Sequence, residues 1–192
     1  MKIFITSIIL VLASFSIATA QTDRKQFSVL FGLNQPVVLH GFNFEVDYWT
    51  KKFVFDYSHG MGLNVTGKMV SSDYENQKLN FKITHSLGFG VGYRINKAFN
   101  LRFEPKMHIY ETYYDGQQQR KSNSVANFTT YTLGVGAYYL WQPFKKNGIS
   151  VVPSVRYWYK VGSTLKEETF KAPNIGFANT PFLVNISIGY TF

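Results

Sequence analysis

The chain has 192 residues and a formal net charge of +9, and 18% of its residues are aromatic while only 16% are charged. This composition excludes a disordered chain, which would be poor in aromatic residues and rich in charge. The chain has no cysteine, which excludes a disulfide-stapled module, an acylated lipoprotein and thiolate chemistry. One domain is expected for this length.

The first twenty residues have the pattern of a secretory signal peptide. Lys2 is the only charged residue in this stretch, an apolar run begins at Ile3, and the stretch ends with Ala18, Thr19 and Ala20. A basic tip, a short apolar segment and an A-x-A ending predict cleavage after Ala20. We therefore expect a signal peptide at residues 1–20 and one exported domain at residues 21–192. No apolar run in that domain is long enough for a spanning helix.

Large apolar and small or polar residues alternate along eight segments of the chain. The alternation is clearest in residues 79–95, where most odd positions are large and apolar and the even positions are polar or glycine. A period of two predicts a β-strand with two different faces, because successive side chains point to opposite sides. The expected strands are residues 27–33, 42–48, 53–58, 79–95, 99–109, 131–141, 149–161 and 182–192.

The connections between these strands alternate in length. The short connections are residues 48–52, 95–98 and 142–148. The long connections, which are also polar, are residues 62–78, 114–125 and 162–181. The connection at residues 34–40 is an exception because it is brief. This alternation places all short turns at one end of an antiparallel, up-and-down, eight-stranded arrangement.

The two faces of the strands decide between two kinds of barrel. A soluble lipocalin-like barrel would carry dense Lys and Glu on its exterior, whereas a membrane barrel has lipid outside and a polar interior. Here the apolar face is uniformly large, and the other face combines Gly, Ser and Thr with a few long charged residues. Because an eight-stranded interior is just wide enough for side chains to fill it, this mixture suits the inside. We predict an all-β fold, an eight-stranded antiparallel up-and-down transmembrane β-barrel.

The polar face predicts a network of side chains in the lumen. Its expected members are Glu45, Asp47, Asp56, Lys82, Arg94, Arg102, Glu104, Lys106, His108, Arg156 and Lys160. With a tight turn at residues 95–98, small residues would lie opposite long polar ones: Gly92, Gly90, Gly88 and Ser86 opposite Arg102, Glu104, Lys106 and His108. Unpaired buried charges are costly, so a paired network that seals the tube is favoured. A narrow, mildly cationic pore remains the alternative.

Aromatic residues gather near both ends of the expected strands. Amphipathic rings form such girdles at the two boundaries of a lipid bilayer. The expected membrane-interface aromatics are Trp49, Tyr93, Tyr139, Trp141, Tyr157, Tyr159 and Tyr190.

The last strand alternates through residues 185–192 and ends on Phe192. This ending resembles the C-terminal signal that outer-membrane barrels present to their assembly machinery. Together with the eight strands, it makes residues 26–192 similar to the small outer-membrane β-barrel proteins of the OmpA/OmpX/OmpW type. The resemblance implies a bacterial outer-membrane location, contact with lipid and lipopolysaccharide, assembly through the C-terminal strand, and a monomer. No peptidoglycan-binding domain is expected after Phe192.

Some barrels of this type are enzymes that modify lipid A with His, Ser and an acidic residue. The candidates here are the dipeptides Ser58-His59 and His85-Ser86. A nucleophilic Ser needs a base within hydrogen-bond reach, and adjacent residues of a strand point to opposite faces. Neither dipeptide therefore forms such a pair by itself, and we expect no enzyme and no cofactor.

Two further kinds of site have weak support in the sequence. Glu45, Glu104 and His108 could approach one another inside the barrel as metal ligands, although we expect no metal site. The long loops carry Lys68, Lys78, Arg120, Lys121, Lys166 and Lys171. These loop cations fit either lipopolysaccharide phosphates or ordinary solvated loops, and we expect no nucleic-acid partner.

The resulting functional prediction is a non-enzymatic outer-membrane barrel with a structural or surface-interaction role. Three alternatives stay open from the sequence: a narrow small-solute channel, a lipid A-modifying enzyme and a soluble lipocalin-like carrier.

Overall fold

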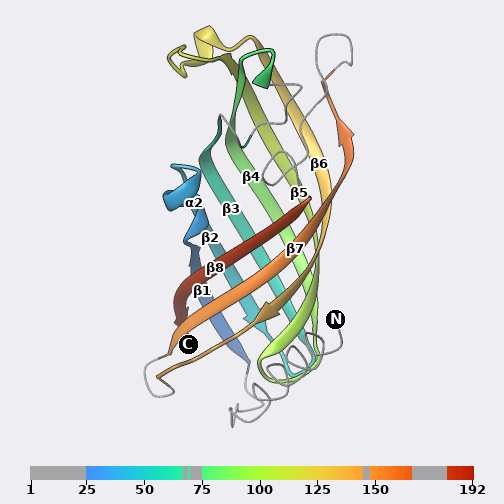
Figure 1. Cartoon of the computed structure of the whole chain (residues 1–192). Helices are drawn as coiled ribbons and strands as arrows, with labels where there is room; N and C mark the ends of the chain where they lie inside the picture. Colours follow the sequence, from blue (N-terminus) through green and yellow to red (C-terminus); the bar gives the residue numbers. More distant parts are fainter. Residues whose placement is uncertain (1–24, 67–68, 70–74, 145–147, 166–180) are drawn as a thin grey trace, which may run out of the picture.

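A computed structural model describes residues 25–66, 69, 75–144, 148–165 and 181–192. The expected signal peptide at residues 1–20 lies outside the described residues. Eight antiparallel strands form a closed barrel in which sequence neighbours pair and the first strand pairs with the last (Figure 1). The predicted eight-stranded antiparallel up-and-down fold is confirmed.

The strands follow the order of the sequence pattern. They are β1 (Gln26–Gly32), β2 (Phe42–Trp49), β3 (Phe53–Val65), β4 (Leu79–Arg94), β5 (Phe99–Tyr114), β6 (Ala126–Tyr139), β7 (Ile149–Ser163) and β8 (Phe182–Thr191). A short helix, α2 (Asn34–Val38), connects β1 to β2, and a 3-10 turn, η3 (Lys121–Asn123), lies between β5 and β6. Across the described part of the chain, the helices are too short and too polar to cross a membrane.

The barrel wall has unequal height. β1 has 7 residues and β8 has 10, whereas β4 and β5 have 16 each. In Figure 1 the strands β3 to β6 therefore rise above β1, β2 and β8 at the end with the long loops. α2 lies on the low side, where the Gln35 carbonyl accepts hydrogen bonds of 3.1 Å from the amides of Leu39 and Gly41.

In most of the barrel, large apolar side chains point outward and polar side chains point inward. Along β5, Leu101 and Phe103 are exposed on the exterior, whereas Asn100, Arg102 and Glu104 are buried inside. Every strand contributes to this exterior. Its exposed members include Phe27, Phe31, Phe42, Phe53, Phe55, Phe89, Val91, Tyr93, Leu101, Phe103, Tyr131, Val135, Val155, Tyr157, Val184, Ile188 and Tyr190.

The alternation changes phase near the long-loop end. In β4 the register shifts between Ile83 and His85. In β3 the burial pattern changes at Gly62, whose φ of +64° is the left-handed conformation that glycine tolerates. An extra residue in a strand moves every later side chain to the opposite face. Residues beyond the two irregularities therefore have their inward and outward positions exchanged.

At this level the polarity of the wall is reversed, through the two irregularities in β3 and β4 and through residue type alone in β5 and β6, whose alternation is unbroken. The inward residues form an apolar cluster of Leu63, Val65, Leu79, Phe81, Ile83, Tyr110 and Phe128. The Tyr110 and Phe128 rings stack with their centroids 4.9 Å apart. On the outward side, Asn64, Lys82, Glu111 and Asn127 are successive partners across β3, β4, β5 and β6. We call this part (residues 63–65, 79–83, 110–112 and 126–128) the upper barrel and the rest the lower barrel.

The phase change corrects one predicted lumen residue. Lys82 lies between the inward residues Phe81 and Ile83, so it belongs to the outward row and pairs in register with Asn64 and Glu111. A strict period of two through β4 assigns it to the lumen because the irregularity at Thr84 leaves no signal in that pattern.

Candidate functional site

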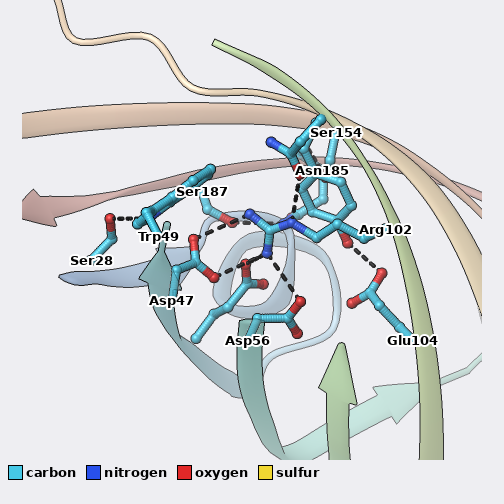
Figure 2. Close-up of polar contacts among 12 residues, drawn as sticks. Ser28, Asp47, Trp49, Asp56, Arg102, Glu104, Ser154, Asn185 and Ser187 are labelled. Carbon is cyan, nitrogen blue, oxygen red and sulfur yellow. Dashed lines mark hydrogen bonds and ion pairs between the residues drawn. The ribbon is translucent and has the colours of Figure 1, made fainter. Parts of the chain in front are cut away.

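Inward residues of β2, β3, β5 and β7 build a layer of charge inside the lower barrel. Asp47 of β2 and Asp56 of β3 are register partners, and Arg102 of β5 reaches both from across the lumen (Figure 2). Arg102 is flanked on β4 by Gly92, where an added Cβ would lie 2.8 Å from Arg102 Cγ. The small residue thus leaves the room that the long side chain needs.

Arg102 is the centre of this layer. Its Nη1 lies 2.7 Å from Glu45 Oε1, 3.0 Å from Asp47 Oδ1 and 3.3 Å from Asp56 Oδ2. Its Nη2 donates to Asp47 Oδ2 at 3.2 Å, and its Nε donates to Asn100 Oδ1 at 2.9 Å. The contact with Asp47 is bidentate, the geometry in which guanidinium and carboxylate bind most strongly.

Glu104 is the second centre. Its Oε1 lies 3.5 Å from Lys106 Nζ and 3.9 Å from Arg156 Nη1, and the Tyr138 hydroxyl donates to its Oε2. Arg156 Nη2 also lies 3.5 Å from Glu45 Oε2. Arg156 therefore connects Glu104 to the carboxylates around Arg102, and the layer is one continuous network.

Aromatic rings enclose the cations of the network. The Arg102 guanidinium lies 4.1 Å from the centroid of Tyr138 and 5.3 Å from that of Trp49. Arg156 lies 4.8 Å from the Tyr138 centroid, and Lys106 lies 4.8 Å from the Trp158 centroid. A cation over a ring face in a dry interior is attracted by the ring's quadrupole, so these rings stabilise charge that has left water.

The placement of Trp49 corrects a predicted interface residue. Its side chain is fully buried in the lumen, and its Nε1 donates to Ser28 Oγ at 2.8 Å. Tyr48 is the outward residue of β2 at this level, so the next residue must point inward. Tyr138 and Trp158 were missed in the sequence, although both stand at polar-face positions of their strands and the alternation alone places them inside.

Apolar side chains fill the lumen on both sides of the charged layer. Towards the short turns, Leu30, Trp49, Val54, Tyr138, Leu140 and Val152 form the lower apolar cluster. Towards the long loops lies the apolar cluster of the upper barrel. Between that cluster and the charges, a cavity of about 60 Å³ is lined by residues that include Gln35, His108 and Trp158.

The other predicted lumen residues lie at the margins of this layer. Arg94 is at the short-turn mouth, where its guanidinium donates to the carbonyls of Thr50 at 2.5 Å and Lys97 at 3.0 Å. His108 Nε2 lies 3.2 Å from Thr132 Oγ1 deeper in the barrel. Lys160 is half-buried and is the register partner of Thr132.

The remaining predicted interface aromatics lie on the outer surface. Tyr93, Trp141, Tyr157, Tyr159 and Tyr190 are exposed and Tyr139 is half-buried. The exposed Phe192 ring packs edge-on against Tyr190 with centroids 4.9 Å apart, and its amide donates to the Phe27 carbonyl at 2.8 Å. The chain end thus closes onto β1.

The structure places each candidate serine and its neighbouring histidine on opposite faces of the wall, although it brings His59 and His85 together. Ser58 is buried in the lumen while His59 points outward, and His85 points outward while Ser86 is turned inward beside His108. No group of three or more His, Asp or Glu residues is spaced for a metal ion within the described ranges. Lys68, Lys166 and Lys171 lie outside the described residues, whereas Lys78, Arg120 and Lys121 lie in described loops.

The chain is similar to solved structures but matches no protein family. No protein-family model matches the chain, and no curated protein matches it. The crystal structure of Ail, the attachment invasion locus protein of Yersinia pestis, is 14% identical, with a TM-score of 0.45, and the match covers 88% of this chain and 99% of that chain. The backbone structure of the Yersinia pestis outer membrane protein Ail in a phospholipid bilayer nanodisc is 16% identical, with a TM-score of 0.40, and the match covers 88% of this chain and 100% of that chain.

Proposed function

We propose that this protein is an integral outer-membrane β-barrel that anchors a water-exposed barrel end and its loops at the cell surface. One observation carries the proposal: the lower barrel has a charged interior and a continuous apolar exterior. In water this arrangement would expose large rings while it buries ions, and both are unfavourable. In a bilayer the same arrangement satisfies both faces.

The reversed polarity of the upper barrel supports the same orientation. Its outward row of Asn64, Lys82, Glu111 and Asn127 suits water, and its apolar residues are sheltered inside. Where a strand leaves lipid for water, its apolar side chains are sheltered only if they point inward. The irregularities at Gly62 and Thr84 therefore mark the expected outer boundary of the membrane.

The filled lumen favours an anchoring role over transport. The charged network is paired, and apolar clusters lie above and below it. The interior cavity of about 60 Å³ holds on the order of two waters, which is too little for a carried ligand. The exterior of the lower barrel is apolar, whereas the exterior of a soluble carrier would be polar. The separation of Ser58 from His59 disfavours lipid A chemistry.

We further propose how the protein reaches the outer membrane and what it contacts there. Export would depend on the signal peptide at residues 1–20, and insertion on recognition of the last strand and Phe192 by the assembly machinery. The exposed tyrosines and Trp141 would lie at the lipid boundaries, and the loop cations would face lipopolysaccharide. We propose a monomer that works without cofactor and without nucleic acid.

Fractionation of cells that express the full chain tests the location. We expect the protein in outer membranes, with gel mobility that changes on heating because a closed barrel resists detergent. Recovery in the soluble periplasm would overturn the assignment. Reconstitution in planar bilayers tests the sealed lumen: steady single-channel conductance would contradict it and would favour the narrow channel.

A further inference from the structure

Four side chains that the barrel does not need for its core form a cluster on the outer surface. Tyr57, His59 and Met61 follow one another along the outward face of β3, and His85 stands opposite Met61 on β4. His59 Nε2 lies 3.2 Å from His85 Nδ1, and Tyr57 Oη lies 3.3 Å from His59 Nδ1. His85 is exposed, and Met61 is partly exposed beside it.

The spacing of the two imidazoles suits a shared metal ion. With metal–nitrogen bonds of about 2.0 Å, two ligating nitrogens lie about 2.8 Å apart at the square-planar angles of Cu²⁺ and about 3.3 Å apart at tetrahedral angles. The two histidine nitrogens, which share a hydrogen bond in this structure, are 3.2 Å apart and so lie within this range. We propose that His59 Nε2 and His85 Nδ1 bind one divalent transition-metal ion, with copper preferred over zinc and with water in the remaining positions.

The neighbouring residues support this assignment. A metal-binding imidazole usually donates its second N–H to a nearby acceptor, which fixes the ring. When His59 Nε2 binds the ion, Nδ1 carries the proton and donates it to Tyr57 Oη, so Tyr57 is a positioning residue. Imidazole favours Cu²⁺ over Zn²⁺ in the Irving–Williams order, and a thioether such as that of Met61 selects Cu⁺.

The position of the cluster makes it accessible. Met61 and His85 lie directly below the irregularities at Gly62 and Thr84, one row beneath the polar residues of the upper barrel. By contrast, His108 is buried in the lumen and bonded to Thr132. The placement of the pair at a membrane boundary rests on the proposed function, whereas the spacing of the two nitrogens does not.

Metal titration of the purified, folded full chain in detergent micelles tests the site. Cu²⁺ and Zn²⁺ would be competed against a chromophoric chelator, and electron paramagnetic resonance of the Cu²⁺ form would report its nitrogen ligands. We expect one ion per chain and hyperfine structure from two imidazoles. His59→Asn and His85→Asn should each weaken binding at least tenfold, while His40→Asn, elsewhere on the surface, should leave it unchanged.

Two further variants sharpen the result. Tyr57→Phe should weaken Cu²⁺ binding a few-fold and move its pH profile, because the ring of His59 loses its fixed orientation. When the titration is repeated with Cu⁺ under a chemical reductant, Met61→Leu should bind Cu⁺ more weakly than the wild type, while its Zn²⁺ binding is unchanged. Heat-modifiable mobility confirms that each variant is folded. Equal affinity of the wild type and the His59→Asn/His85→Asn double variant would overturn the site, whatever membrane the protein occupies.

Discussion

The upper barrel continues β3 to β6 of the lower barrel, but the two parts bury opposite kinds of side chain. β4 shows the contrast along a single strand: Phe81 is fully buried inside the upper barrel, whereas Phe89 is 66% exposed on the exterior of the lower barrel. Between them the register shifts at Thr84. The same strand can therefore have its apolar face outward in one part and inward in the other. One irregular residue is enough to exchange the two faces.

The interiors of the two parts are also held together differently. The lower barrel depends on ion pairs and cation–ring contacts around Arg102 and Glu104, whereas the upper barrel depends on stacked rings and aliphatic packing. Breaking a buried ion pair leaves an uncompensated charge, and truncating a packed ring leaves a cavity. The same substitution should therefore have different effects in the two parts.

The largest effect is expected at the centre of the charged layer. Arg102→Met leaves Glu45, Asp47 and Asp56 without their shared cation and should lower the free energy of unfolding by roughly 3–5 kcal/mol. Denaturant-induced unfolding in lipid vesicles measures this. Unchanged stability would mean that the interior is wet and the charges are screened.

Asp56→Asn is the matched control for that variant. Asp56 contacts Arg102 as an ion pair at 3.3 Å, but its carboxylate oxygens accept no hydrogen bond in the described part of the structure, and it shares Arg102 with two other carboxylates. Its loss should cost about 1 kcal/mol or less. A cost equal to that of Arg102→Met would show that Asp56, rather than Asp47, is the main partner.

A matched pair of phenylalanines on β4 compares the two parts directly. Phe81→Ala removes a ring from the upper apolar cluster and should cost roughly 3–5 kcal/mol. Phe89→Ala removes an outward ring, 5.1 Å from the Tyr57 ring, and should cost about 1 kcal/mol. Amide hydrogen exchange should show where the loss falls: in the upper barrel for Phe81→Ala, with β1, β2 and β8 still protected. Equal losses would contradict the reversed polarity.

Much of the fold could be predicted because the alternation is regular over most of each strand. All eight strands, their order and their antiparallel pairing are confirmed. The upper ends of β3, β5 and β6 were missed because polar residues such as His59, Glu111 and Asn127 interrupt the apolar face there. The helix α2 was missed because five residues are too few for a helical period to show.

The charged layer could be predicted as a set but not as contacts. Alternation indicates which side of the wall a residue occupies, yet the partner of Arg102 depends on barrel closure, which brings β5 within reach of β2. Lys82 and Trp49 were assigned wrongly for different reasons. Lys82 lies just before an irregularity that leaves no signal in the sequence. Trp49 has the residue type of an interface aromatic, although its position in β2 indicates the lumen.

A charge on the exterior of the lower barrel should lower the free energy of unfolding by less than Arg102→Met does. Val91→Arg places a guanidinium on the proposed lipid face, opposite Phe55 and Phe103, and should cost on the order of 2–4 kcal/mol at the depth of the bilayer centre. Unfolding in vesicles measures the loss, and the same variant in a small-headgroup detergent should lose less. A harmless result in bilayers would mean that this face does not meet lipid.

The smallest effect is expected for the opposite change in the upper barrel. Lys82→Leu removes a charge from the outward row, where Lys82 is flanked by Asn64 and Glu111, and surface substitutions of this kind usually change stability by no more than about 0.5 kcal/mol. The same unfolding assay applies, with Val91→Arg as its reference. The variant also tests the phase change itself, because a lumen Lys82 would belong to the ion network and its removal would cost several times more. A large loss for Lys82→Leu would restore the strict alternation through β4 and abolish the distinction between the two parts of the barrel.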